Sequence, residues 1–206
     1  RITLDSRAEL GRTASAAARL GARATIRFRV RPDLVGHDEP SEMSPQGASV
    51  RDATQRYKAG IPTEDLLAIT GTDIRDPNLD VVGVHLHLGR HSADPAIWTS
   101  AIDALAELLA RLRESWGGWV PRELDLGGGF PAPRDPFGRA LPQRADAPPR
   151  SPGVDAYAEA ACEHLAERLH GLGIAPDEIQ LEIEPGRALY ADYGQKITFP
   201  AVVLND

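Results

Sequence analysis

The sequence predicts an α/β fold in which parallel strands alternate with covering helices. Short apolar runs that suit buried strands recur along the 206 residues, and amphipathic segments with helical spacing separate them. Glycine or charged residues directly follow three of these runs, as is typical of the carboxyl ends of strands in parallel sheets. This order favours a (β/α) barrel or a doubly wound sheet.

The first predicted elements are a strand, a helix and a second strand. Residues 1–5 form a short apolar run, and Ser6-Arg-Ala-Glu9 is a capping box that predicts the start of a helix. Residues 24–30 alternate apolar and basic side chains. Because side chains alternate along a strand, Arg27 and Arg29 should share one face.

The next part of the chain predicts a loop, a short helix and a third strand. Residues 33–55 are rich in Pro, Gly, Ser and charge and lack periodicity, so we expect a long surface loop there. A short helix is expected over 63–69. The strand at 81–89 alternates with period two, which places His85 and His87 on one face.

The longest helix is expected to begin at Asp94, which can cap it, with Pro95 in its first turn. The strand Glu123-Leu-Asp-Leu126 then runs directly into three glycines, Gly127, Gly128 and Gly129. The remaining elements are predicted as a loop over 132–152, a helix over 154–172, a strand over 178–184 and a weak strand over 197–204.

The overall charge and the cysteine content exclude several classes of partner and location. The net charge of −7 and the pI near 5.4 argue against a broad nucleic-acid or anionic-membrane surface. With Cys162 as the single cysteine, no disulfide framework can form, which suits a reducing compartment. The sequence has no apolar run long enough to span a membrane and no signal-peptide pattern, so we expect a cytoplasmic protein.

Two strand ends carry groups that can bind an anionic ligand. Successive glycines expose backbone N–H groups that can form an anion-binding nest, although the same run also occurs in ordinary turns. The strand ending in Leu181-Glu-Ile-Glu-Pro-Gly-Arg187 delivers a carboxylate at Glu184 and a guanidinium at Arg187. If the glycine run and this strand end meet, one site would hold both an acid and a base.

Three motifs in this order resemble the fold-type III pyridoxal-phosphate decarboxylases, which include diaminopimelate, ornithine and arginine decarboxylases. They are Gly-Val-His-Leu-His-Leu-Gly at 83–89, Leu-Asp-Leu-Gly-Gly-Gly-Phe-Pro at 124–131 and Glu-Pro-Gly-Arg at 184–187. The resemblance implies a (β/α)8 TIM-type barrel of the alanine racemase-like kind, with only part of the barrel represented in residues 1–192. Residues 193–206 would be the start of, or the return to, a second β domain.

The resemblance also implies roles for individual residues. The glycine run would hold the phosphate of pyridoxal 5′-phosphate through backbone N–H groups, with Gly186 and Arg187 beside it. Glu184 would face the pyridine nitrogen and keep it protonated, so that the ring can accept electrons from the α-carbon of the substrate. His87 would stack on the ring, and Arg29 would lie close to the cofactor. Glu184 and His87 are therefore the expected catalytic residues, and no metal is expected.

The sequence departs from the family at two places. Arg90 stands where many members have a phosphate-binding serine, so Arg90 itself or Ser92 is expected to make that contact. The catalytic lysine of the family lies upstream of everything seen here, and neither Lys58 nor Lys196 fits its setting. We therefore interpret the chain as an internal piece of a longer enzyme, in preference to a degenerate homologue.

The favoured activity is the pyridoxal-phosphate-dependent decarboxylation of diaminopimelate or of a basic amino acid such as ornithine, lysine or arginine. The alternatives are a racemase or epimerase on the same barrel, a non-catalytic or regulatory homologue that lacks the lysine, and a phosphate-binding barrel without pyridoxal chemistry. The expected partner is a small amino acid. We also expect a homodimer with active sites at the interface, or a complementing segment that supplies the missing strands.

Other polar residues near these motifs have structural interpretations. His85 is expected to be a hydrogen-bonded core histidine, and Asp125 is expected to point into the barrel as a hydrogen-bond acceptor. Glu182 could support the site or be purely structural. Cys162 on a helix is expected to be a small core residue in preference to a nucleophile.

Overall fold

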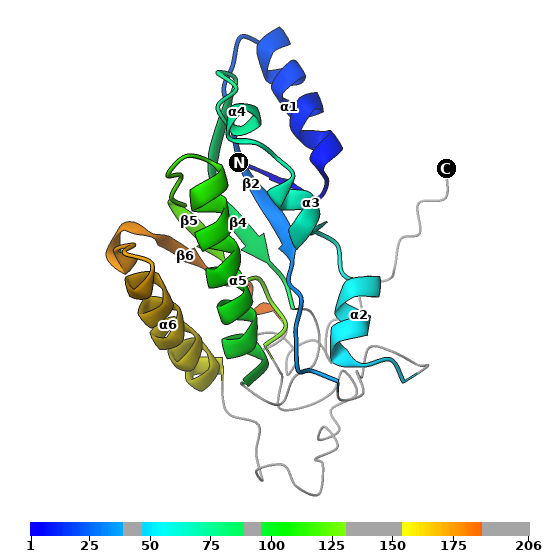
Figure 1. The fold of residues 1–206 in the computed structure, drawn as a ribbon, viewed down its shortest axis with the longest axis vertical. Helices are drawn as coiled ribbons and strands as arrows, with labels where there is room; N and C mark the ends of the chain where they lie inside the picture. The colour runs from blue at the N-terminus through cyan, green and yellow to red at the C-terminus, as the bar shows by residue number, and fades with distance from the viewer. Residues whose placement is uncertain (39–46, 89–95, 131–153, 187–206) are drawn as a thin grey trace, which may run out of the picture.

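The computed structural model describes residues 1–38, 47–88, 96–130 and 154–186 (Figure 1). Several expectations lie outside these residues. They concern Arg90, Ser92, Arg187, Lys196, the cap at Asp94 and Pro95, the loop at 132–152, the strand at 197–204 and the domain boundary at 193.

The described residues form one sheet of six strands, and all of its pairings are parallel. Neighbouring strands follow the order β1-β2-β4-β5-β6, and β3 also pairs with β2. Because β4 occupies one edge of β2 along most of its length, β1 and β3 follow one another along the other edge. The strands are β1 Ile2–Leu4, β2 Ala24–Arg31, β3 Ile61–Pro62, β4 Leu79–Leu86, β5 Glu123–Asp125 and β6 Gln180–Glu182.

Helices precede or follow these strands in the predicted alternation. The capping box at Ser6 is present, and the Glu9 side chain accepts the backbone N–H of Ser6 at 3.1 Å. The helices are α1 Arg7–Arg19, α2 Val50–Tyr57, α3 Thr63–Leu67, α4 Gly71–Ile74, α5 Ala96–Ser115 and α6 Val154–Gly171, and a 3-10 turn, η1, spans Pro176–Glu178.

The expectation of an unstructured loop over 33–55 was wrong at its end, because α2 begins at Val50. The Ser49 side chain caps this helix by accepting the N–H of Asp52 at 3.0 Å. Ala53 is buried and anchors the helix. The only local signal for this helix was its capping serine. In a segment rich in turn-forming residues, a capping serine cannot be told apart from a serine in a turn.

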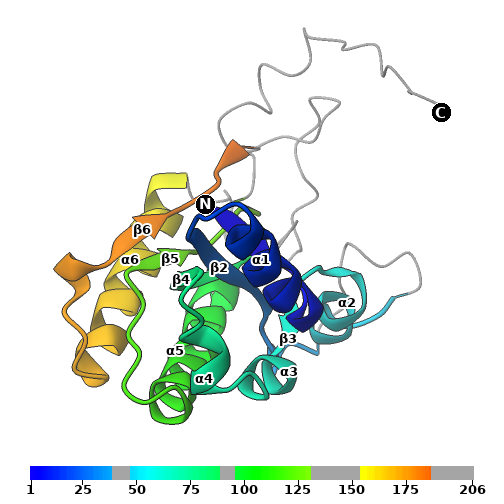
Figure 2. The same ribbon diagram turned by 90° about the horizontal axis from the view of Figure 1, so that it is seen from above.

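The two faces of the sheet differ in chemistry. Phe28, Val84 and Leu124 pair in register and belong to the apolar core that also includes residues of α5 and α6. The intervening residues, including Arg29, His85 and Asp125, are also in register with one another and point to the opposite face. Figure 2 shows α3, α4, α5 and α6 along one side of the sheet. The polar face is thus the side away from these helices.

A β-bulge interrupts the regular pairing of β4 with β2. Ile26 pairs with Val81, but the next residue, Arg27, pairs with Gly83, so Val82 is the extra residue. Gly83 approaches β5 so closely that a Cβ atom at this position would lie 1.9 Å from the carbonyl oxygen of Glu123. Only glycine fits at this position.

Replacing Gly83 with alanine should destabilise the protein by about 3 kcal/mol, because the backbone of β5 would have to move. The Gly11→Ala variant is the matched control: a Cβ at Gly11 in α1 meets nothing within 4 Å, and alanine favours a helix over glycine by up to about 1 kcal/mol. Thermal unfolding of both variants tests this expectation, and equal melting temperatures would contradict it.

The expectation that Cys162 is a core residue was wrong, because this residue lies exposed on α6.

Among the described residues, no helix is both long enough and apolar enough to cross a membrane.

Candidate functional site

The carboxyl ends of β4, β5 and β6 converge at one edge of the sheet. His87 follows β4, Gly127 lies two residues after the end of β5, and Glu184 lies two residues after the end of β6. The backbone N–H of Glu184 donates to the carbonyl of Gly127 at 2.7 Å, which extends the contact between β5 and β6 beyond the strands themselves. The structure therefore brings together residues from all three sequence motifs.

His87 contacts both the glycine run and Glu184. Its Nδ1 atom accepts the backbone N–H of Gly128 at 3.3 Å and lies 3.4 Å from Glu184 Oε2. Burial lowers the pKa of His87, and the nearby charges of Lys58 and Arg29 act in the same direction. The neutral ring is therefore favoured, and its unprotonated Nδ1 suits the N–H of Gly128.

Crowding around the glycines excludes side chains from this edge. A Cβ atom on Gly127, whose φ is 65°, would lie 2.3 Å from the carbonyl oxygen of Leu86. A Cβ on Gly128 would lie 2.5 Å from the carbonyl oxygen of Glu184. Bare backbone is thus required where the three strands meet, and a ligand can approach the main chain there.

The N–H groups of the glycine run are not equivalent. Gly127 donates its N–H to Asp125 Oδ1 at 2.7 Å, so this group already has a buried partner. Gly128 donates to His87 over the longer distance of 3.3 Å. Gly128 is therefore better placed than Gly127 to donate to a phosphate.

A network of buried and half-buried charges lies beside the site on the polar face of the sheet. Arg27 lies at its centre, with Nη2 at 2.7 Å from Asp125 Oδ2 and Nη1 at 2.6 Å from Glu182 Oε2. The Asp125 contact is an ion pair whose alignment does not make a hydrogen bond. Arg1 also pairs with Glu182, at 2.5 Å, and with Glu123.

This network shows the polar partners of Asp125 and Glu182. Asp125 is fully buried and accepts a hydrogen bond, as predicted. Glu182 is an ion-pair partner of Arg27 and Arg1. Burial acts to raise the pKa of Glu182, but hydrogen bonds from these two arginines outweigh it, so the net pKa is lowered.

His85 is buried as predicted, with 6% of its surface exposed, but the expectation that it is hydrogen-bonded was wrong within the described part of the chain. Neither ring nitrogen has a hydrogen-bond partner there. Its Nε2 atom lies 4.0 Å from both Asp125 Oδ2 and Glu184 Oε2. The alternation of β4 directs the ring toward the two carboxylates. No polar group among the described residues lies within hydrogen-bond distance of either ring nitrogen.

Arg29 lies next to these histidines, since it pairs in register with His85. Its buried Nε atom has no hydrogen-bond partner among the described residues and lies 3.9 Å from Asp5 Oδ1. The Arg29 charge lowers the pKa of both His85 and His87. The guanidinium is thus close enough to influence the site electrostatically.

His85, His87 and Glu184 also offer three potential metal ligands, whose atoms lie within 4.8 Å of one another. Ligand atoms about 2.1 Å from a tetrahedral zinc ion lie about 3.4 Å apart, so these side chains would have to move closer together to bind one.

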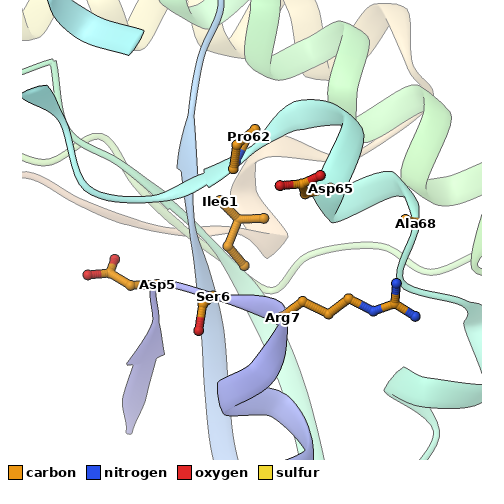
Figure 3. A pocket seen from close by; sticks show the side chains of 7 residues that line it. All are labelled: Asp5, Ser6, Arg7, Ile61, Pro62, Asp65 and Ala68. Atoms are coloured by element: carbon orange, nitrogen blue, oxygen red, sulfur yellow. The ribbon is translucent and has the colours of Figure 1, made fainter. Parts of the chain in front are cut away.

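A pocket of about 240 Å³ lies between the start of α1 and α3 (Figure 3). Its charged lining residues are Asp5, Arg7 and Asp65, and Asp5 connects it to Arg29. A larger pocket, of about 620 Å³, is lined by Leu79, Asp80 and other residues at the amino ends of the strands. It therefore lies at the end of the sheet opposite His87 and Glu184.

Comparison with known proteins identifies the family. Residues 1–191 match the pyridoxal binding domain of the pyridoxal-dependent decarboxylases. The chain belongs to this family. A diaminopimelate decarboxylase of Pseudomonas fluorescens is 31% identical over 198 residues, and that of Neisseria meningitidis serogroup A is 27% identical over 197. Each alignment covers 96% of this chain but only 40% and 41% of the respective relative, so the chain spans about two fifths of their length.

Solved structures of pyridoxal-dependent decarboxylases share the fold. A diaminopimelate decarboxylase from M. jannaschii in complex with L-lysine has a TM-score of 0.61 at 21% identity, over 92% of this chain and 38% of that chain. The biosynthetic arginine decarboxylase from Campylobacter jejuni has a TM-score of 0.60 at 18% identity, over 90% and 26%. The expectation of a partial (β/α) barrel is confirmed.

Proposed function

We propose that this chain forms the cofactor-binding part of a pyridoxal-phosphate-dependent amino-acid decarboxylase. The observation that carries the proposal is the convergence of Glu184, His87 and the glycine run at one edge of the sheet. Because the chain spans about two fifths of its curated relatives, the rest of the enzyme would supply the other side of the site.

The residues present fit pyridoxal phosphate in shape and charge. The glycine run leaves backbone uncovered where a Cβ would collide, which suits a bound phosphate. The side chain of His87 is 28% exposed and that of Glu184 is 48% exposed, so both can reach a ligand. A flat neutral imidazole and a carboxylate are the groups that a protonated pyridine ring needs on its face and at its nitrogen.

When bound, pyridoxal phosphate supplies a ring that accepts the electron pair left on the substrate α-carbon after carbon dioxide departs. We assign to Glu184 the task of holding a proton on the pyridine nitrogen. His87 would pack against the ring and fix its tilt. Gly128 and Gly129 would donate backbone N–H groups to the phosphate, with Gly127 shaping the turn.

Further phosphate contacts are proposed for residues beside the glycine run. Gly186 lies two residues after Glu184 and would approach the phosphate with its bare backbone, because its N–H already donates to the carbonyl of Glu184 at 2.9 Å. Arg187 follows it directly and would add a cationic donor. Arg90, or Ser92 in its place, would supply the contact that many family members make with a serine.

The catalytic lysine is proposed to come from outside this chain, because neither Lys58 nor Lys196 matches its sequence setting. We propose that residues 1–192 form part of the barrel and that 193–206 lead into or return to a second β domain. The remaining strands would come from a complementing segment, and the complete enzyme would be a cytoplasmic homodimer with active sites at the interface.

The proposed substrate is diaminopimelate, with ornithine, lysine or arginine as further candidates. The curated relatives support this choice, because they are diaminopimelate decarboxylases. The M. jannaschii structure was obtained with L-lysine, which is what diaminopimelate becomes when it loses one carboxyl group. No described feature favours a racemase, an epimerase or a non-catalytic homologue over a decarboxylase.

The full-length protein should bind pyridoxal phosphate with an absorbance band near visible wavelengths, and borohydride should fix the cofactor to a lysine. Carbon dioxide should be released from diaminopimelate or from one of the basic amino acids. Release of a racemised substrate without carbon dioxide would show that the protein is a racemase and not a decarboxylase. A protein that shows neither the band nor carbon dioxide would overturn the proposal.

A further inference from the structure

His85 is a buried titratable side chain on the polar face of the sheet, and neither of its ring nitrogens has a hydrogen-bond partner among the described residues. It lies in β4 between two carboxylates, and its Nε2 atom is 4.0 Å from Asp125 Oδ2 and 4.0 Å from Glu184 Oε2. A buried polar group without a hydrogen-bond partner destabilises the fold. Such a group at a ligand site indicates a role that packing alone does not explain.

Asp125 does not depend on His85. One of its oxygens accepts the N–H of Gly127 at 2.7 Å, and the other lies 2.7 Å from the guanidinium of Arg27. The negative charge of Asp125 is therefore already compensated, and its position is fixed. Of the two carboxylates that face His85, Glu184 is the one held by fewer and longer polar contacts.

Glu184 has two histidine nitrogens near its carboxylate. The closer one, Nδ1 of His87, lies at 3.4 Å, but the N–H of Gly128 points at the same atom. A neutral ring that accepts from Gly128 through Nδ1 has no proton there for Glu184. Among the described side chains this leaves Nε2 of His85 as the nitrogen that can donate to Glu184.

The surroundings of His85 favour the neutral form. Burial lowers its pKa most strongly, the carboxylates Asp125 and Glu184 act in the opposite direction, and the charges of Arg27 and Arg29 lower it further. A neutral imidazole carries a single N–H. Since Nε2 faces both carboxylates, an N–H on this nitrogen is directed at the carboxylate oxygens of Asp125 and Glu184. The Nε2–H tautomer is therefore favoured.

We propose that His85 is a positioning residue that donates its Nε2–H to Glu184 and so fixes the carboxylate that serves the cofactor. A ring shift of about 1 Å would close the gap to a normal hydrogen-bond distance. Oε2 of Glu184 would then be held by His85, and Oε1 would be left for the pyridine nitrogen. The effect on the cofactor rests on the proposed function, whereas the contact between His85 and Glu184 does not.

The contact can be tested without cofactor by nitrogen NMR of the full-length protein labelled at histidine. The His85 ring should be in the Nε2–H tautomer, and Glu184→Gln should shift its Nε2 resonance. His170 is exposed at the end of α6 and supplies the control, because its resonances should not move. A His85 ring protonated on Nδ1 alone, or one that does not respond to Glu184→Gln, would overturn the proposal.

The effect on the site can be tested by two substitutions that differ in hydrogen bonding. His85→Leu should weaken the binding of pyridoxal phosphate about tenfold or more, because a bond to a charged acceptor is lost. His85→Gln keeps an N–H donor and should recover most of the affinity. His170→Gln is the matched control and should bind the cofactor as the parent protein does.

The outcomes separate positioning from packing and from a failure of the proposed function. Equal losses in His85→Leu and His85→Gln would indicate packing alone, and unchanged affinity in both would remove any role; either result would overturn the proposal. If the parent protein binds no pyridoxal phosphate, the proposed function fails, and the NMR experiment still decides whether His85 holds Glu184.

Discussion

Replacing Glu184 with glutamine should lower the decarboxylation rate of the full-length enzyme by about a hundredfold to ten-thousandfold. Glutamine has nearly the same size but no negative charge, so it cannot keep a proton on the pyridine nitrogen. Without that proton the ring is a poor electron acceptor. The affinity for pyridoxal phosphate should fall only about tenfold, as for the loss of the contact between His85 and Glu184, because the glycine run that would hold the phosphate is untouched. Steady-state rates and cofactor titrations measure the two effects separately.

Glu178→Gln provides the matched control for this prediction. Glu178 is exposed in the 3-10 turn just before β6. It therefore lies at the amino end of the strand whose carboxyl end leads to Glu184. It should leave both the rate and the cofactor affinity unchanged. A Glu184→Gln enzyme with the parent rate would remove the role assigned to Glu184, and a variant whose cofactor affinity falls as far as its rate would make that role structural.

Replacing Arg27 with methionine should destabilise the protein by about 3–5 kcal/mol. Methionine fills much of the same volume, but it leaves Asp125 as a buried carboxylate without its ion-pair partner. The side chains of Arg27 and Asp125 are only 12% and 1% exposed, so water cannot replace the lost charge. Glu182 also loses the hydrogen bond that Arg27 donates at 2.6 Å. Denaturant unfolding of the full-length protein measures the loss.

Two further variants show whether the unpaired charge is the cause. Arg19→Met changes an exposed arginine at the end of α1 and should cost less than about 1 kcal/mol. Asp125→Asn in the Arg27→Met background removes the stranded charge, and its Oδ1 can still accept from Gly127. This double variant should regain part of the lost stability. If it is less stable than Arg27→Met alone, the ion pair is not the source of the effect.

The sequence predicted those features that depend on local patterns. The capping box at Ser6, the alternation in β2 and the apolar run before Gly127 each identify an element from residues adjacent in the chain. The family resemblance, carried by motifs at three strand ends, implied that His87 and Glu184 would lie at one cofactor site, and the carboxyl ends of parallel strands do share one edge. The helix α2 was missed, since its serine cap lies in a segment with many turn-forming residues.

Contacts between distant strands could not be predicted in the same way. Arg27 and Glu182 are 155 positions apart, and they meet only because β2, β4, β5 and β6 pair in one particular register. Alternation predicted which face Arg27 occupies but not its partner. The sequence also did not predict that the ring nitrogens of His85 lack a hydrogen-bond partner among the described residues, because a histidine on that face was expected to find one.

The extra residue at Val82 sets the rotational phase of β4 relative to β2. If the strands paired without it, Arg29 would lie beside Val84 in place of His85. Every later side chain of β4 would then point to the opposite face of the sheet. Valine and leucine would then face the ligand, and both imidazoles would be driven in among the helices. A single irregularity in the backbone, several residues before the site, thus determines whether β4 presents polar or apolar side chains to the ligand.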